Sequence, residues 1–243
     1  VRDLTARADA VGLKLLVMPP LEDIVRAGYS VKLNQLREVN VEDLLGRRPV
    51  QTDLSAIAGY VSGKVVLITG AGGSIGSELA RQVHKFGPSE LVLLDRDESG
   101  LHAVQLSIYG QGLLDTPDMV LADIREAEVV DRVFAEHQPE VVFHAAALKH
   151  LPMLEQYPQE GWKTNVLGTL NVLEEARRHG VRHFVNITTD KAPAATSVLG
   201  KTKRAATELT AGIAAEGAVT YLSELFGNVF GKGVYMLHTF NSQ

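Results

Sequence analysis

The sequence predicts an α/β fold, a doubly wound parallel sheet with helices on both faces. Three observations support this prediction: short apolar runs recur along residues 65–222, amphipathic helical periods separate them, and a glycine-rich turn follows the first run. Apolar residues at consecutive positions suit strands that are buried on both faces, as in a parallel sheet. Strands that alternate with helices imply βαβ crossovers, which place the helices on both faces of the sheet.

Six apolar runs are the predicted strands, at residues 65–68, 91–94, 119–121, 141–143, 184–187 and 219–222. Three stripes of apolar residues with helical spacing lie between them. The first is Ile75, Leu79 and Val83; the second is Val129, Val130, Val133 and Phe134; the third is Val166, Leu170, Leu173 and Ala176. Each stripe predicts a helix that packs on the sheet.

The first 58 residues have a different pattern. The apolar run 13–18 precedes Pro19-Pro20 and predicts a buried strand, whereas residues 31–45 show no clean period. We therefore expect residues 1–58 to be the remnant of a small preceding α/β region with its linker, and the polar stretch 46–55 is the best candidate for the boundary. Residues 59–243 are expected to form the sheet domain.

Charge and composition exclude several classes of protein. The 243 residues include 24 Lys and Arg against 29 Asp and Glu, which gives a net charge of −5. Because non-specific nucleic-acid binding depends on clustered Lys and Arg side chains, no nucleic-acid partner is expected. The absence of cysteine excludes disulfides, Cys-ligated zinc and thiol catalysis, and no metal site is expected. No apolar run approaches the ~20 residues of a membrane span, so no membrane contact by this chain is expected. Because the chain begins with Val1 rather than Met, we expect a piece of a longer protein.

A phosphate-binding turn is predicted after the first strand. Here the chain reads Thr69-Gly70-Ala71-Gly72-Gly73-Ser74-Ile75-Gly76 and continues into the first helix. In such a turn the first glycine permits the tight bend, the second lets a pyrophosphate approach the backbone, and the third allows close helix packing. The helix N-terminus adds free N–H groups and the positive end of its dipole. A Rossmann-type dinucleotide site is favoured over an ordinary glycine-rich turn, and the missing P-loop lysine disfavours a nucleoside triphosphatase.

Acidic residues after the second and third strands indicate how the cofactor is held. Asp95 ends the second strand about twenty residues after the glycines, where such an acid binds the adenosine ribose hydroxyls. It would repel a 2′-phosphate and so favours NAD over NADP, although Arg96 beside it could pair with that phosphate. Asp123 follows the third strand and is placed to meet the adenine; an N-cap for the next helix is the equally open alternative.

The ends of the fourth and fifth strands offer groups for chemistry. The alanines at 145–147 would let a flat cofactor lie against the backbone, with Lys149 and His150 facing the substrate side. Thr189, Asp190 and Lys191 follow the fifth strand, and a hydroxyl, a carboxylic acid and an amine could orient a substrate hydroxyl, donate a proton and accept one. Solvated loops are the alternative at both strand ends.

Together these motifs resemble the extended short-chain dehydrogenases/reductases, and within them the polysaccharide-biosynthesis group of UDP-N-acetylglucosamine 4,6-dehydratases. The resemblance rests on the T-G-x-x-G-x-x-G turn, the HAAALKH segment at 144–150, the KTNVLGT segment at 163–169, the TDK triplet and residues 200–204. It extends over residues 31–243, because residues 37–47 resemble the linker that precedes the catalytic domain in the family's large, membrane-anchored members. The chain is thus expected to be a soluble piece of such a protein on the cytoplasmic side, without the C-terminal region that closes over the substrate.

The resemblance implies an internal redox reaction on a UDP-N-acetylhexosamine, carried out by a homo-oligomer. Oxidised nicotinamide takes the C4 hydride, water is eliminated across C5 and C6, and the hydride returns at C6. By position, Thr189 would hold the C4 hydroxyl, Asp190 would protonate the departing C6 hydroxyl and Lys191 would take the C5 proton. The residues that match the family's site for NAD or NADP are Thr69, Gly70, Gly73, Ser74, Ile75, Gly76, Asp95, Arg96, Asp123, Ile124, Ala145, Ala146, Ala147, Lys149, Asn165 and Lys203.

The chain departs from the family pattern at several positions. Leu199 stands where a tyrosine is usual, and leucine cannot exchange a proton. Large members of the family also lack that tyrosine, so dehydratase activity stays the leading hypothesis. Residues 194–197 and 225–228 replace further polar contacts of the usual pattern. Two alternatives therefore remain: a nucleotide-sugar epimerase, which normally needs the tyrosine, and a catalytically inactive, cofactor-binding sensor or assembly protein.

Overall fold

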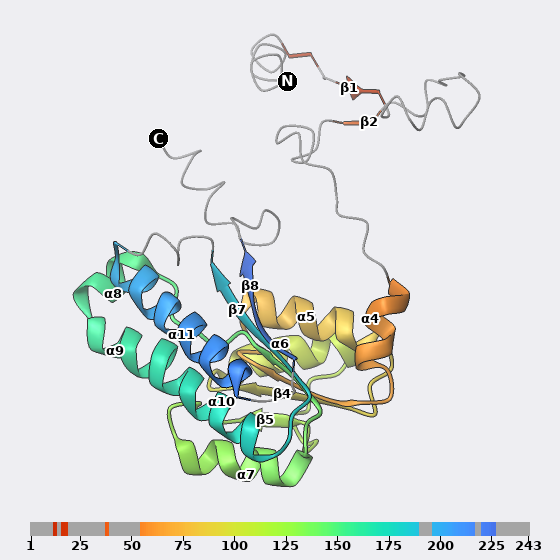
Figure 1. Ribbon diagram of the computed structural model, residues 1–243. Helices are drawn as coiled ribbons and strands as arrows, with labels where there is room; N and C mark the ends of the chain where they lie inside the picture. Colours follow the sequence, from red (N-terminus) through yellow and green to blue (C-terminus); the bar gives the residue numbers. More distant parts are fainter. Residues whose placement is uncertain are drawn as a thin grey trace. The chain divides into compact units, whose positions relative to one another are not determined.

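A computed structural model describes residues 12–13, 16–18, 37–38, 54–189, 196–216 and 220–226, with the backbone alone at the ends of some elements (Figure 1). The chain divides into two compact units, Val1–Thr52 and Asp53–Gln243, which are described separately below. The boundary predicted between residues 58 and 59 falls within helix α4, Leu54–Val61.

The described residues of the first unit form one small ladder. Strand β1 (Leu16–Val17) pairs antiparallel with β2 (Arg37–Glu38). The prediction of a buried strand at 13–18 is wrong for the residues described there, because the side chains of Leu13, Leu16 and Met18 are 66%, 46% and 60% exposed. A buried strand needs a layer packed on its faces. No described residue of this unit supplies such a layer.

The second unit is built on a six-stranded sheet in the order β5-β4-β3-β6-β7-β8, in which every neighbouring pair is parallel. The strands are β3 (Val65–Thr69), β4 (Glu90–Asp95), β5 (Met119–Leu121), β6 (Val141–His144), β7 (His183–Thr189) and β8 (Thr220–Phe226). All six predicted strands are confirmed. Strands β4 and β5 lie on one side of β3, and the later strands β6, β7 and β8 lie on its other side, as in a Rossmann fold.

Helices cover both faces of the sheet (Figure 1). They are α5 (Ser74–His84), α6 (Glu98–Tyr109), α7 (Ala127–His137), α8 (Leu151–Gln156), α9 (Pro158–Trp162), the π-helical turn η2 (Lys163–Gly168), α10 (Thr169–Arg178) and α11 (Val198–Ala215). Within the described ranges no helix combines the length and the apolar character that crossing a membrane requires.

Two hydrophobic cores lie on opposite faces of the sheet, because successive side chains of a strand point to opposite faces. Val66 and Ile68 belong to the core under α5 and α6, whereas Leu67 between them belongs to the core under α7, α10 and α11. In the second core Phe134 and Phe184 are fully buried. The doubly wound arrangement predicted from the apolar runs is confirmed.

The helices predicted from the three apolar stripes are confirmed, although each stripe includes half-buried residues, such as Val129 on α7 and Leu170 on α10. In α5 the buried residues are Gly76, Ala80 and Val83, while Ile75 and Leu79 are half-buried. The reason is close approach: a Cβ added at Gly76 would overlap the carbonyl oxygen of Gly70. The face of α5 that meets the turn therefore has to be small rather than bulky.

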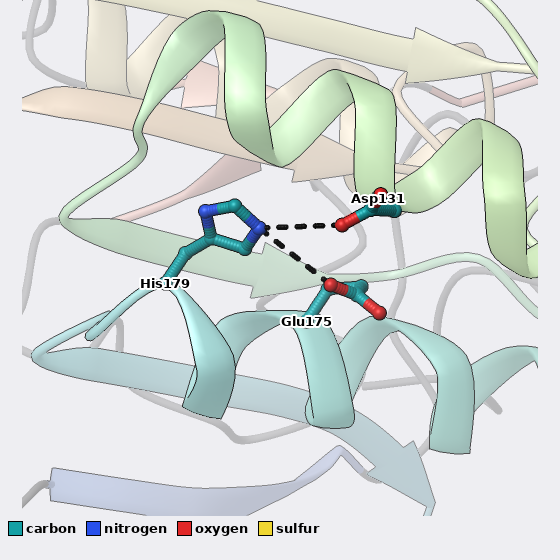
Figure 2. A group of neighbouring side chains, drawn as sticks. All are labelled: Asp131, Glu175 and His179. Atoms are coloured by element: carbon teal, nitrogen blue, oxygen red, sulfur yellow. Dashed lines mark hydrogen bonds and ion pairs between the residues drawn. The ribbon is translucent and has the colours of Figure 1, made fainter.

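An ion-pair cluster joins α7 to the C-terminal end of α10 (Figure 2). The Nε2 atom of His179 lies 3.5 Å from Oδ1 of Asp131 and 3.6 Å from Oε2 of Glu175. Burial, followed by the nearby Asp131, raises the pKa of Glu175, while the guanidinium of Arg178, 2.9 Å from its Oε1, opposes that shift. The cluster lies near the start of β7, whereas the strand ends that carry ligands in this fold lie at the other edge.

Candidate functional site

A cleft of about 210 Å³ opens at the carboxyl ends of β3 and β6. Between these two central strands the order in which successive strands are added to the sheet reverses. In open α/β sheets this reversal point is where ligands bind. The cleft is lined by Gly70, Gly72, Gly73, Leu94, Asp95, Arg96, Asp97, Ala122, Asp123, Ile124, Ala145, Ala146, Ala147, Leu148 and Thr164. The structure thus brings together most of the predicted cofactor residues, from four different strand ends.

The glycine turn after β3 forms the floor of the cleft. Gly70 has a φ of +70°, in the left-handed region that other residues avoid. A Cβ added there would lie 2.5 Å from the backbone nitrogen of Ala146 and 2.6 Å from its Cα. A side chain at position 70 is therefore excluded for two independent reasons. The backbone conformation is unfavourable for it, and its Cβ would overlap the segment that follows β6.

The turn leads directly into α5, which begins at Ser74 with Gly73 as its N-cap. The Gly73 N–H donates to the carbonyl of Gly70 at 3.1 Å. The N–H groups of the first helical turn, which includes Ser74, Ile75 and Gly76, have no acceptors within the helix. This helix end beside Gly72 and Gly73 is suited to an anion such as a pyrophosphate.

Asp95, at the end of β4, supports the turn and faces the cleft. Its Oδ2 accepts the N–H of Gly72 at 2.8 Å, and its Oδ1 accepts the N–H of Asp97 at 3.0 Å. Each carboxylate oxygen has a second lone pair, so the group can also accept hydrogen bonds from a ligand's hydroxyls. Gly100 of α6 permits this arrangement, since a Cβ there would lie 2.8 Å from the Cα of Gly72.

Asp123 follows β5, lines the cleft and carries a charge network. Its Oδ2 lies 2.6 Å from Arg125 and 3.6 Å from Nη1 of Arg96. Burial alone would raise the pKa of Asp123, but the hydrogen bonds and charge of Arg125, with the charge of Arg96, hold it below the ordinary 3.8. The N-cap alternative for Asp123 is wrong, because α7 begins at Ala127 after Glu126.

The segment 145–148 after β6 is the facing wall of the cleft. Its alanines have small side chains, as expected for a surface against which a flat ligand lies. Thr164 of η2 also lines this wall, and its buried Oγ1 has no hydrogen-bond partner among the described residues. A buried hydroxyl without a partner is costly, so this atom marks a position where a ligand's polar group would be accommodated.

Other predicted cofactor residues lie behind the cleft lining. Thr69 and Asn165 are buried and bind other protein groups: the Thr69 hydroxyl contacts His144, and the Asn165 amide bonds the backbone of Leu148. The Lys203 ammonium donates to the carbonyl of Ile187 at 2.9 Å, and burial lowers its pKa to about 8. Lys149 lines a neighbouring hollow of about 310 Å³ that shares Arg96 and Leu148 with the cleft.

The predicted catalytic residues fall at the limit of the described chain. Thr189 is the last residue of β7, which lies beside β6 in the sheet, and only its backbone is described. Asp190 and Lys191 lie outside the described residues. Leu199 is half-buried in the first turn of α11, and its carbonyl accepts a hydrogen bond from the Thr202 hydroxyl. It stands where the family that the sequence resembles usually has a tyrosine.

Sequence reasoning gave no role to His144 and Thr169, which the structure places at the centre of a buried hydrogen-bond network beside the cleft. One available signal was the position of His144, a polar residue at the end of an otherwise apolar strand. Thr169 had no such signal, because its partner lies 25 residues away in the chain.

The buried His144 makes stability depend on pH. Burial, reinforced by the positive charge of Lys203, lowers its pKa from 6.5 to about 3. Between these values only the unfolded chain takes up the proton, so the free energy of unfolding should fall as pH drops below 6.5 and be retained above it. Urea unfolding at pH 7 and about pH 5 should show the wild type losing about 2 kcal/mol more than His144→Gln. Equal losses would contradict the buried neutral imidazole.

Comparisons with known proteins agree with this geometry. The family model described as "Polysaccharide biosynthesis protein" matches residues 66–243. The chain is 39% identical over 236 residues to the capsular polysaccharide biosynthesis protein CapD of Staphylococcus aureus, covering 96% of this chain and 39% of CapD. It is 30% identical over 175 residues to a UDP-N-acetylglucosamine 4,6-dehydratase (inverting) of Campylobacter jejuni, covering 70% of this chain and 51% of that protein. A UDP-glucose 4-epimerase of Rickettsia rickettsii is 30% identical over 187 residues, covering 74% of this chain and 53% of the epimerase.

Solved structures share the fold. Pen from Bacillus thuringiensis superposes with a TM-score of 0.65 at 29% identity, covering 75% of this chain and 58% of Pen. The UDP-glucose 4-epimerase of Stenotrophomonas maltophila, solved with bound NAD and formylated UDP-arabinopyranose, superposes with a TM-score of 0.58 at 25% identity, covering 66% of this chain and 52% of the epimerase. The chain spans from about two fifths to nearly three fifths of the length of these proteins. By its fold, its glycine cleft and the extent of the family match, the chain belongs to the polysaccharide biosynthesis protein family of extended short-chain dehydrogenases/reductases.

Proposed function

We propose that this chain is the cofactor-binding part of an NAD(P)-dependent UDP-N-acetylhexosamine 4,6-dehydratase that supplies precursors for surface polysaccharide. The observation that supports it best is the cleft at the ends of β3 and β6, with Asp95 and the glycine turn on one side and the alanine segment on the other. The strand next to β6 ends in Thr189, the first residue of the Thr-Asp-Lys triplet. Cofactor site and acid/base residues would then share one edge of the sheet.

The residues of the cleft fit a dinucleotide. The turn from Gly70 to Gly73 leaves a cradle that side chains would fill, and the N-terminus of α5 offers N–H groups to a pyrophosphate. Asp95 would accept the ribose hydroxyls, and Asp123 with Ile124 would flank the adenine. Oxidised nicotinamide, when bound, supplies a reversible hydride acceptor. The carboxylate of Asp95 and the engagement of Arg96 with Asp123 favour NAD over its 2′-phosphorylated form.

In this proposal the chain's own residues move protons and orient the sugar. Thr189 would hold the C4 hydroxyl, Asp190 would donate a proton to the departing C6 hydroxyl, and Lys191 would take the C5 proton. A ketone at C4 makes the C5 proton more acidic, so an amine with a lowered pKa could serve as the base. Because Leu199 has no exchangeable proton, the general base in this proposal is Asp190 or Lys191.

The direct test uses a full-length version of the protein, since this chain covers only part of its relatives. Incubation with NAD and UDP-N-acetylglucosamine should yield a 4-keto-6-deoxy sugar, which NMR identifies by the new C6 methyl group. Failure to convert any UDP-hexose would contradict the proposal. We propose that the whole protein works as a homo-oligomer on the cytoplasmic side of the membrane.

An epimerase is the second candidate, favoured by the 30% identity to a UDP-glucose 4-epimerase. The half-buried Leu199 argues against it, because a 4-epimerase normally uses a tyrosine at that position as its acid/base group. The same incubation separates the two, since an epimerase returns a hexose with an intact C6 hydroxyl. Calorimetry with NAD and UDP-sugar tests a third alternative, an inactive sensor, which would bind the cofactor with no sugar-dependent change.

A further inference from the structure

His144 is the last residue of β6 and is almost completely buried, with 2% of its surface exposed. Its Nδ1 lies 2.7 Å from the hydroxyl of Thr69 at the end of β3, and its Nε2 lies 2.9 Å from the hydroxyl of Thr169 at the start of α10. The imidazole therefore links the two central strands of the sheet to the helix that covers them.

The direction of these hydrogen bonds follows from Thr169. Its hydroxyl donates to the carbonyl of Asn165 at 2.8 Å, so its single proton is used and its oxygen is left to accept from His144. Nε2 of His144 must then carry the ring proton, and Nδ1 must accept the proton of the Thr69 hydroxyl. This burial in an apolar surrounding also keeps the ring neutral.

The same network continues to the far end of the cleft wall. The side-chain oxygen of Asn165 accepts the N–H of Leu148 at 2.8 Å, and its amide donates to the Leu148 carbonyl at 3.0 Å and to the Thr202 hydroxyl at 3.1 Å. At the near end, the N–H of Ala145 donates to the carbonyl of Thr69 at 3.0 Å. The segment 145–148 is thus held at both ends. His144 and Thr169 connect Thr69, the partner of Ala145, to Asn165, the partner of Leu148.

We propose that His144, as its neutral Nε2–H tautomer, is a positioning residue that holds the segment 145–148 at the distance from Gly70 that the cofactor cleft requires. It touches no part of the cleft itself, because the lining begins at Ala145. Its role is indirect: by fixing the end of β6 against Thr69 and Thr169, it fixes the backbone of Ala146, which lies against Gly70. The link to cofactor binding rests on the proposed function, whereas the link to the geometry of the segment does not.

The energetic reason lies in burial. Removing one partner of a buried hydrogen bond leaves the other partner unsatisfied, which costs more than an average hydrogen bond contributes. With Thr169 lost, the Nε2–H of His144 would have no acceptor, and a rotation of the ring to find one would move the end of β6. Because Gly70 and Ala146 are in direct backbone contact, even a small movement changes the cleft.

The first experiment determines the tautomer. In the wild-type chain, ¹⁵N chemical shifts of the imidazole nitrogens should show a protonated Nε2 and an unprotonated Nδ1, unchanged from about pH 8 to about pH 5. An Nδ1–H tautomer, or an imidazolium at the lower pH, would overturn the proposal. This measurement needs no cofactor.

The second experiment compares Thr169→Val with Thr210→Val, a matched control in the same core. Both hydroxyls are buried, with 2% and 1% of the residue exposed, and both donate to the carbonyl four residues earlier at 2.8 Å. Thr169 accepts from His144, whereas Thr210 accepts from Asn186 at 3.1 Å, and among the described residues neither the Thr210 nor the Asn186 side chain has a hydrogen bond to the segment 145–148. The two substitutions should therefore lower the thermal midpoint by similar amounts.

Only Thr169→Val should affect the cleft. Amide hydrogen exchange at Ala145 and Leu148 should become roughly tenfold faster in this variant and the Kd for NAD roughly tenfold weaker, with neither change in Thr210→Val. Thr169→Ser, which keeps the hydroxyl, should restore both. Unchanged exchange at the two amides would overturn the positioning role. A wild-type chain that fails to bind NAD would contradict the proposed function alone, because the exchange result still tests the role of the network.

Discussion

Gly70→Ala is expected to destabilise the sheet domain by about 2–5 kcal/mol and to abolish NAD binding. The first reason is the backbone, since φ is +70° and the left-handed region is unfavourable for alanine. The second is a clash, since the new Cβ would lie 2.5 Å from the Ala146 nitrogen, a backbone atom that cannot rotate away. Urea unfolding and calorimetry with NAD measure the two effects.

Gly180→Ala is the matched control for this prediction. Gly180 has a φ of +71°, but a Cβ added there would meet no heavy atom within 4 Å. It should show the conformational penalty alone, about 1–2 kcal/mol, with NAD affinity retained. If the two variants lost equal stability, the contact between the turn and the segment 145–148 would not matter, and the account of the cleft floor would be wrong.

Lys191→Ala in the full-length protein is expected to lower turnover of UDP-N-acetylglucosamine by roughly 10²–10⁴-fold. The reason is the loss of the amine proposed to take the C5 proton, the step that the C4 ketone makes possible. NAD affinity should stay unchanged, because the proposed cofactor contacts come from the glycine turn, Asp95 and the alanine segment. Steady-state kinetics and calorimetry on the same preparation separate the two properties.

The control for this variant is Lys201→Ala. Lys201 is an exposed lysine on α11 that is not among the residues lining the cleft, so its removal changes the net charge by the same amount and should leave turnover intact. Retained turnover in Lys191→Ala would contradict the assignment of Lys191 as the general base. It would instead indicate Asp190, the only other titratable residue of the Thr-Asp-Lys triplet.

Much of the fold was predictable because it depends on local patterns. Each of the six strands appears in the sequence as a short apolar run, since a strand buried on both faces needs apolar residues at consecutive positions. The run at 13–18 shows the limit of this rule. It is also apolar, but in the described residues it forms only the two-residue strand β1, and the side chains of Leu13, Leu16 and Met18 are exposed, because burial depends on a layer that the run itself does not encode.

The residues that line the cleft were predictable where a sequence motif lies at the end of a strand. Gly70, Asp95, Asp123 and the alanines at 145–147 all lie at the end of a strand or within three residues after it, and parallel strands bring their carboxyl ends to one edge of the sheet. Thr69 and Asn165 come from the same motifs but lie behind the lining, because their side chains bind His144 and Leu148. Spacing along the chain cannot distinguish a side chain that faces a ligand from one that supports it.

The sequence by itself determined the order of strands and helices, the glycine turn and the acid that follows the next strand, because each is written in residues that are adjacent in the chain. Only the tertiary structure decided which small face of α5 meets the turn, that the Asp95 carboxylate holds the N–H of Gly72, and that His144 joins Thr69 to Thr169. Those partners are 23, 75 and 25 residues apart. Such contacts form only after the crossovers have placed the strands side by side, and hydrogen-bond geometry then selects the partners.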